Sequence, residues 1–282
     1  MLAAGASRTT GLLGLTAAPV HGRRGLAAVG AIALPLVAGV AFLAAPGELD
    51  EKLMLALRGV CAQRPDHGFL VDGAPLALEA RMYGIFAGFS VAVGIPWLRG
   101  HCRRAELPRG AVAGVLIFFV LSLLIDGMNA LLYAMGSPHL YVPRNDLRLV
   151  TGLLGGVGLA GYAAPVVSFV WWREREPVPL YSSWTDVVWS LGAAALLAAL
   201  VLGGLPSRTA LSALGLLAVV GSFWLVSTYV AALLWHGSGA ADTWGDLAGP
   251  SLFAFAVSLG ELAGLGALRN WMEVSFGISW VV

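Results

Sequence analysis

The chain has 282 residues, of which 58% are hydrophobic and only 12% are charged. Soluble domains carry about 25% charged residues, so this chain cannot cover a water-soluble globule of its size, and we infer a membrane protein. Its 17 basic and 16 acidic residues leave a net charge of +1, which excludes a nucleic-acid-binding surface that depends on bulk positive charge. Two cysteines are too few for a disulfide framework or for a zinc site made of cysteines alone.

Seven mostly apolar windows are long enough to cross a bilayer, which takes about 20 residues. They predict an all-α fold, a polytopic transmembrane helical bundle of about seven spans. The windows cover residues 25–46, 78–98, 110–134, 149–172, 186–205, 210–235 and 249–268. We treat residues 25–268 as one bundle, which follows a leader at 1–24 and precedes an interfacial tail at 269–282.

Two local patterns add detail to the spans. Glu48 to Val60 has leucines at near-helical spacing, so we expect a short interfacial helix there and a loop after it, up to residue 77. Two GxxxG pairs occur in the second and fourth spans, and we interpret them as ordinary packing within the molecule. They are Gly84 with Gly88, and Gly152 with Gly156.

The arginines indicate an orientation. Three of them precede the first span and four lie in the loop 99–109, so the positive-inside rule favours both segments in the cytoplasm. The chain is then a multi-pass protein of the cell inner (cytoplasmic) membrane with a cytoplasmic amino terminus. The loop from His236 to Asp246 falls on the same side although it has no Arg or Lys.

Polar residues gather at the opposite, extracytoplasmic face. Charged side chains at membrane depth cost about 2.5 to 3.5 kcal/mol each, so each needs a partner or a task. In an alternating topology the second span starts, the third ends and the fourth starts at one face, which the loop 47–77 also reaches. The candidate residues there are Cys61, Gln63, Arg64, Glu79, Arg81, Asp126, Asn129, Asn145 and Arg148.

Asp126 lies among apolar residues about one turn inside the third span, where a lone carboxylate either neutralises or recruits a cation. We expect it to be buried and to pair with Arg81 or Arg148. One interpretation is a structural ion pair that locks three helices together. The other is a site for a ligand, an ion or a lipid headgroup.

Two further carboxylates stand apart from this cluster. Glu261 lies in the middle of the last span. It is either a protonatable group in a transport path or the counter-charge of a cofactor, or it is structural and stays neutral or bonds to Ser222, Ser227 or Thr228. Asp186 stands at the start of the fifth span, where the helix would enter the membrane, and we expect it to stay in water.

Four segments in this region resemble the characteristic blocks of a family of bacterial and archaeal predicted membrane proteins called domain of unknown function 2085. The segments are CAQRPDHGF (61–69), LEARMYGIFAGF (78–89), IDGMN (125–129) and RNDLRLVTGLLGG (144–156). The resemblance covers about residues 60–156 and leaves extra spans at 186–268. The family name brings no established activity.

The resemblance also implies a Cys-His pair and a C-x-x-C motif, a ligand set that would suit a metal or redox site. This chain keeps the first cysteine as Cys61 but has Ala62, Glu79 and Met82 where the family has a histidine and two cysteines. We therefore predict no metal site. No cofactor is predicted either, because His139 and His236 each stand alone near a span end.

Three functional hypotheses remain. The first is a non-enzymatic integral membrane protein, permease-like or an accessory subunit of a membrane complex, that contacts the lipid bilayer, other membrane subunits and no nucleic acid. The second is a membrane enzyme for a lipid-linked substrate, with Asp126 or Glu79 as base and Arg81 or Arg148 holding a phosphate. The third is a metal or redox protein centred on Cys61. Recognised hydrolase, NTPase, metalloprotease and dinucleotide-binding motifs do not occur in the sequence.

Overall fold

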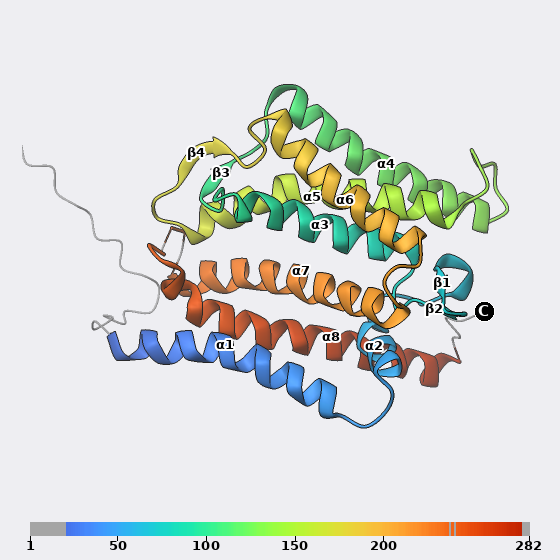
Figure 1. Cartoon of the computed structure of the whole chain (residues 1–282), viewed down its shortest axis with the longest axis horizontal. Helices are drawn as coiled ribbons and strands as arrows, with labels where there is room; N and C mark the ends of the chain where they lie inside the picture. Colours follow the sequence, from blue (N-terminus) through green and yellow to red (C-terminus); the bar gives the residue numbers. More distant parts are fainter. Residues whose placement is uncertain (1–20, 237, 240, 278–282) are drawn as a thin grey trace, which may run out of the picture.

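The computed structural model describes residues 21–236, 238–239 and 241–277, and most of them are helical (Figure 1). Among these described residues, six helices are long and apolar enough to cross a membrane, and a shorter apolar stretch, Val29–Ala44, lies in a seventh helix. The prediction of a helical bundle with about seven spans is confirmed. The seven helices are α1 (His21–Ala44), α3 (Ala80–Leu98), α4 (Gly110–Ala134), α5 (Asn145–Trp171), α6 (Trp184–Leu202), α7 (Arg208–His236) and α8 (Ala248–Phe276). Residues 1–20 of the predicted leader and 278–282 of the predicted tail lie outside the described residues, whereas residues 269–276 of that tail continue helix α8.

The connecting segments contain short elements. The expected helix before the second span is α2 (Leu49–Leu57), which buries Leu53 and Leu57. The expected loop after it contains η1 (Pro65–His67) and a small antiparallel hairpin, β1 (Leu70–Val71) with β2 (Ala74–Pro75). The other connections hold β3 (Arg104–Glu106), β4 (Glu176–Pro179) and η2 (Trp244–Leu247), and β3 pairs with β4 in parallel.

Helix α5 is the centre of the bundle, and α3 packs closely along it through the two glycine pairs. A Cβ atom on Gly84 would lie 2.5 Å from the carbonyl oxygen of Leu149, and one on Gly152 would lie 2.6 Å from that of Arg81. Such approach is open only to residues without a side chain. The interpretation of the GxxxG pairs as packing within the molecule is confirmed.

The loops divide between two ends of the bundle (Figure 1). The segment between α1 and α3, the α4–α5 loop and the α6–α7 loop lie at one end, which we call the Asp126 end. The β3 and β4 segments and η2 lie at the other, which we call the Asp186 end. As the alternating topology predicts, the start of α3, the end of α4 and the start of α5 therefore meet at one end.

Candidate functional site

Asp126 is the centre of the polar cluster at the Asp126 end. It lies on α4 with only 1% of its surface exposed. Arg81, in the first turn of α3, donates from Nη2 to Asp126 Oδ2 at 2.6 Å and from Nε to the same oxygen at 3.2 Å. Of the two partners expected from the sequence, the structure selects Arg81.

The second oxygen of this carboxylate is also occupied. The Tyr141 hydroxyl donates to Asp126 Oδ1 at 2.8 Å, while Thr151 on α5 donates from Oγ1 to Oδ2 at 3.3 Å. Burial and the hydrogen bond to Asp126 raise the pKa of Tyr141 to about 12, so it remains a donor at neutral pH. Asp126 thus joins α3, α4, α5 and the α4–α5 loop.

Asn129 holds the same loop one turn further along α4. Its Oδ1 accepts from the backbone N–H groups of Leu140 at 2.7 Å and Tyr141 at 3.2 Å, and its Nδ2 donates to the Tyr141 carbonyl at 2.9 Å. The side chain is 2% exposed and both of its polar atoms are hydrogen-bonded, so its contacts indicate a structural role.

Arg148 lies in the first turn of α5 and is 8% exposed. Its Nη1 donates to Asn145 Oδ1 at 2.8 Å, whereas Asn145 Nδ2 donates to the carbonyls of Asp66 and Gly68 in the α2–α3 segment. Among the described residues no carboxylate lies within 4 Å of the Arg148 guanidinium. Arg148 therefore carries a buried charge whose direct partner is an amide.

Glu79, at the N-terminus of α3, organises the loop before it. Its Oε1 accepts from the backbone N–H of Arg64 at 3.0 Å, and its Oε2 lies 3.6 Å from His67 Nδ1. Arg64 Nη2 in turn donates to His67 Nδ1 at 2.6 Å. Burial lowers the pKa of His67, and the charges of Arg148 and Arg64 lower it further, so the ring is a neutral acceptor at pH 7.

Cys61 and Gln63 stabilise the same segment. Cys61 is 4% exposed and its Sγ accepts from the backbone N–H of Glu79 at 3.2 Å. Burial raises the pKa of this thiol to about 11. Gln63 has a left-handed backbone (φ 61°), and its Nε2 donates to the carbonyls of Met54 at 2.8 Å and Ala77 at 3.0 Å. Within the described part of the chain, no group of three or more His, Cys, Asp and Glu side chains could hold a metal ion.

Sequence reasoning missed Arg269, which lies on α8 far from the cluster along the chain. It is 8% exposed, and its guanidinium donates to the carbonyls of Arg58, Cys61 and Ala62 at 2.7 to 3.1 Å. Arg269 also forms an ion pair with Glu273, four residues later on the same helix, with Nε 2.8 Å from Oε1. In the sequence this spacing indicates only a pair within one helix, so nothing there predicts the contact with the distant segment. Tyr141 was missed as well.

The predictions for the two isolated carboxylates, Glu261 and Asp186, have different outcomes. Glu261 accepts at Oε2 from Ser227 Oγ at 3.3 Å, one of the three partners considered, but its side chain is exposed on the outside of α8. The expectation that Asp186 stays in water was wrong, because it is 2% exposed and bonds Arg99 Nη1 at 2.6 Å. Ser183 and Asp186 form a capping box at the start of α6. The S-x-x-D spacing was the available signal.

Comparison with known proteins gives a match over one part of the chain. No curated protein and no solved structure matches it. Residues 61–162 match the family model described as "Predicted membrane protein (DUF2085)". The segment begins at Cys61 and includes α3, α4 and the first two thirds of α5, hence all nine residues of the candidate site. The resemblance expected over about 60–156 is confirmed, and residues 61–162, about a third of the chain, are similar to the DUF2085 family of predicted membrane proteins.

Proposed function

We propose that this protein is a non-enzymatic integral membrane protein that binds the phosphate group of a lipid headgroup through Arg148 at the Asp126 end. The observation that carries the proposal is the state of Arg148, which is buried and has no carboxylate within 4 Å among the described residues. A buried cation without a counter-charge is costly, and an anion from outside would offset that cost.

Charge in the surrounding cluster supports this assignment. Arg81 is paired with Asp126, and Arg64 lies beside Glu79, with its Nε 3.9 Å from Oε1. Among the described residues of this cluster, Arg148 is therefore the buried cation that has no carboxylate beside it. A guanidinium presents a planar set of donors that matches the oxygens of a phosphate.

The contacts of the carboxylates favour binding over catalysis. A general base needs a free oxygen within reach of the proton it removes. Asp126 accepts hydrogen bonds at both oxygens and is sealed from the surface. Glu79 accepts from the Arg64 backbone at one oxygen and lies beside His67 at the other.

The position of the site supports a lipid headgroup as the source of the phosphate. Arg148 is in the first turn of a membrane-spanning helix, which is the depth of lipid headgroups. We propose that this end faces the outside of the inner membrane, since the dense arginine loop 99–109 lies at the opposite end.

Lipid binding to purified, delipidated protein tests the proposal. Native mass spectrometry with phosphatidylglycerol should show a bound lipid on the wild type, and Arg148→Gln should weaken its binding about tenfold, or about 1.4 kcal/mol. Arg144→Gln is the matched control, because Arg144 lies at the same end, is 72% exposed and pairs with Asp146. In lipid-free detergent, inorganic phosphate should raise the unfolding temperature much less than the lipid does. An equal effect would identify a free anion as the ligand.

Stability without lipid separates a binding role from a structural one. If Arg148 serves a ligand, Arg148→Gln removes an uncompensated buried charge, and the lipid-free protein should unfold at the same or a higher temperature. Equal lipid binding by Arg148→Gln and Arg144→Gln would contradict the proposal. So would a clear loss of lipid-free stability in Arg148→Gln.

A further inference from the structure

Glu261 is a carboxylate in the hydrocarbon region on the outside of the bundle. It is the fourteenth of the 29 residues of α8, so it lies roughly 20 Å from either end of the helix at 1.5 Å per residue. A hydrocarbon core about 30 Å thick must therefore include it. Its side chain is exposed on the surface.

Glu261 is poorly satisfied by its own chain. One hydrogen bond reaches it, from Ser227 Oγ on α7 at 3.3 Å, and no Arg, Lys or His in the described ranges lies within 4 Å. The buried carboxylate of Asp126, in contrast, accepts hydrogen bonds from Arg81, Tyr141 and Thr151. Within the described part of the chain, Glu261 therefore lacks the donors that Asp126 has.

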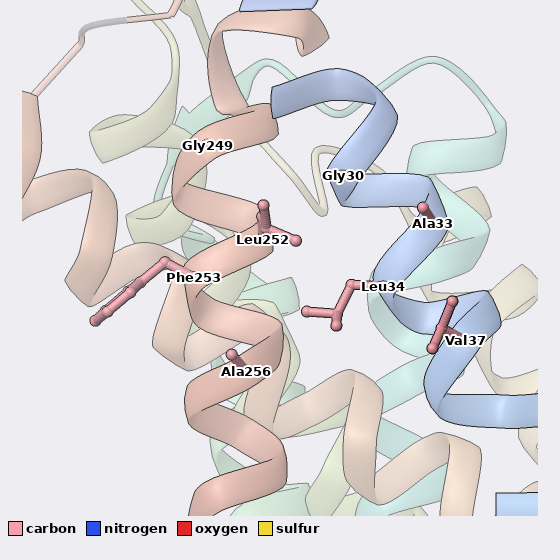
Figure 2. Close-up of a pocket in the computed structure, with 8 residues that line it drawn as sticks. All are labelled: Gly30, Ala33, Leu34, Val37, Gly249, Leu252, Phe253 and Ala256. Atoms are coloured by element: carbon pink, nitrogen blue, oxygen red, sulfur yellow. The ribbon is translucent and has the colours of Figure 1, made fainter. Parts of the chain in front are cut away.

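Helix α1 does not shield this carboxylate. An apolar groove of about 660 Å³ separates α1 from the first turns of α8 (Figure 2). Its lining residues are Gly30, Ala33, Leu34, Val37, Gly249, Leu252, Phe253 and Ala256. The groove ends at Ala256, more than one turn before Glu261, and includes no polar side chain that could reach it.

The surface beside Glu261 is shaped for close contact with a helix. Gly260, Ala263, Gly264 and Ala267 are all exposed, and a Cβ atom on Gly260 or Gly264 would meet nothing within 4 Å. Small residues at this spacing let the backbones of two membrane helices approach, and a polar residue beside them adds an interhelical hydrogen bond. We call these four residues and Glu261 the Glu261 face.

We propose that the Glu261 face docks a transmembrane helix of another membrane protein that carries an Arg or Lys near the middle of the bilayer. Charge complementarity identifies the partner, because a cation at the same depth is the group that keeps a mid-membrane carboxylate ionised and offsets the cost of its charge. A second copy of this chain does not supply one. In the described spans every Arg, Lys and His lies within about two turns of a helix end, so a second copy would oppose one carboxylate with another.

A designed membrane peptide tests the partner chemistry directly. The full chain is placed in phosphatidylcholine vesicles with a fluorescent leucine-rich transmembrane peptide that has one central Arg, and energy transfer measures association. The wild type should bind this peptide about tenfold more tightly than the same peptide with Leu in place of Arg. Glu261→Gln, which preserves the size of an exposed side chain, should remove the difference. Gly264→Leu should weaken binding while the carboxylate remains.

Relocating the carboxylate gives the matched control. The double variant Glu261→Gln with Leu196→Glu places an acid on α6, where Leu196 is 62% exposed, without the small residues of the Glu261 face. Weak peptide binding by this variant supports the proposal, whereas full binding would show that any lipid-facing acid suffices and would overturn it. Equal affinity of the wild type for the two peptides would also overturn it, as would Glu261-dependent self-association of the chain without peptide. If Glu261→Gln does not fold, the two peptides and Gly264→Leu still decide the question.

Discussion

Arg81 and Asp126, 45 residues apart in the chain, form a two-point contact between α3 and α4 in which both guanidinium donors reach the same carboxylate oxygen. The Arg81 Nη2 atom also approaches the Asp126 carbonyl at 3.3 Å. Because Asp126 is almost fully buried while the Arg81 side chain is 25% exposed, the carboxylate is the partner that depends on the pair. This ion pair is the central interaction between α3 and α4 at the Asp126 end.

Removing the Asp126 carboxylate alone should therefore destabilise the folded protein. We expect Asp126→Ala to lower the free energy of unfolding by about 3 to 5 kcal/mol, the range found when one partner of a buried ion pair is deleted. It would leave Arg81 without its counter-charge and Tyr141 without its acceptor. Unfolding of the purified protein in detergent by heat or denaturant measures the change.

Replacing both partners supplies the control. An Arg81→Met, Asp126→Leu double variant puts apolar side chains of similar size in place of the pair, and it should be more stable than Asp126→Ala, because a buried pair is often no better than apolar packing. A double variant as unstable as the single one would show that the pair itself, and not the stranded Arg81, carries the stability.

The glycine contacts between α3 and α5 lead to a second prediction. Gly84→Ala and Gly152→Ala should each destabilise the protein by about 1 to 3 kcal/mol, as in overpacked cores, because the new methyl group would collide with backbone atoms of the facing helix. Gly127→Ala on α4 is the control, since a Cβ atom there meets nothing within 4 Å. Thermal unfolding of the three variants compares them. Equal effects at Gly84 and Gly127 would contradict the packing argument.

The number of spans and their alternation could be predicted because long charge-free windows leave few alternatives in a membrane. The same logic brought Arg81, Asp126 and Arg148 to one end without any knowledge of packing. It could not choose between Arg81 and Arg148 as the partner of Asp126. That choice depends on the angle and depth at which α3 meets α5, which the glycine contacts determine.

Contacts between distant segments were the part that sequence patterns could not supply. Arg269 bonds three carbonyls of the segment after α2, and nothing in its own neighbourhood marks it as more than a helix-end cation. Asp186 was placed in water because it stands where a helix would enter the membrane. In the structure Arg99 and the backbone of residues 182 and 183 enclose the Asp186 carboxylate. This burial depends on how the loops pack against each other.

The neutral state of His67 predicts a dependence of stability on acid pH. The folded-state pKa of His67 is lowered, so between the folded value and the unfolded value near 6.5 the unfolded chain binds more protons. The stabilising contribution is present above about pH 6.5 and is lost as the pH falls through the folded pKa. The charges that face the ring are Arg64, Arg148, Asp66 and Glu79.

We expect the unfolding temperature of the wild type to fall between pH 7 and pH 5, and His67→Gln to reduce this fall. The pKa of His101 at the Asp186 end is lowered too, by burial and then by the charge of Arg104. His101→Gln should therefore reduce the fall in the same way, and the double variant should be the least sensitive to acid. A His67→Gln variant with an unchanged pH profile would show that the ring titrates as freely in the folded protein as in the unfolded chain.

The orientation of the bundle can be tested with single cysteines on a background in which Cys61 and Cys102 are replaced by serine. His139→Cys reports the Asp126 end, where His139 is exposed, and Glu174→Cys reports the Asp186 end, where the Glu174 side chain is 88% exposed. If the arginine loop 99–109 faces the cytoplasm, a membrane-impermeant maleimide should label His139→Cys in intact cells and Glu174→Cys in inverted vesicles only. The reverse pattern would place Arg148 at the cytoplasmic leaflet, and the phosphate would then have to come from a lipid of that leaflet. The seven-span arrangement requires an odd number of spans between the two cysteines. Labelling of both from the same side of the membrane would contradict it.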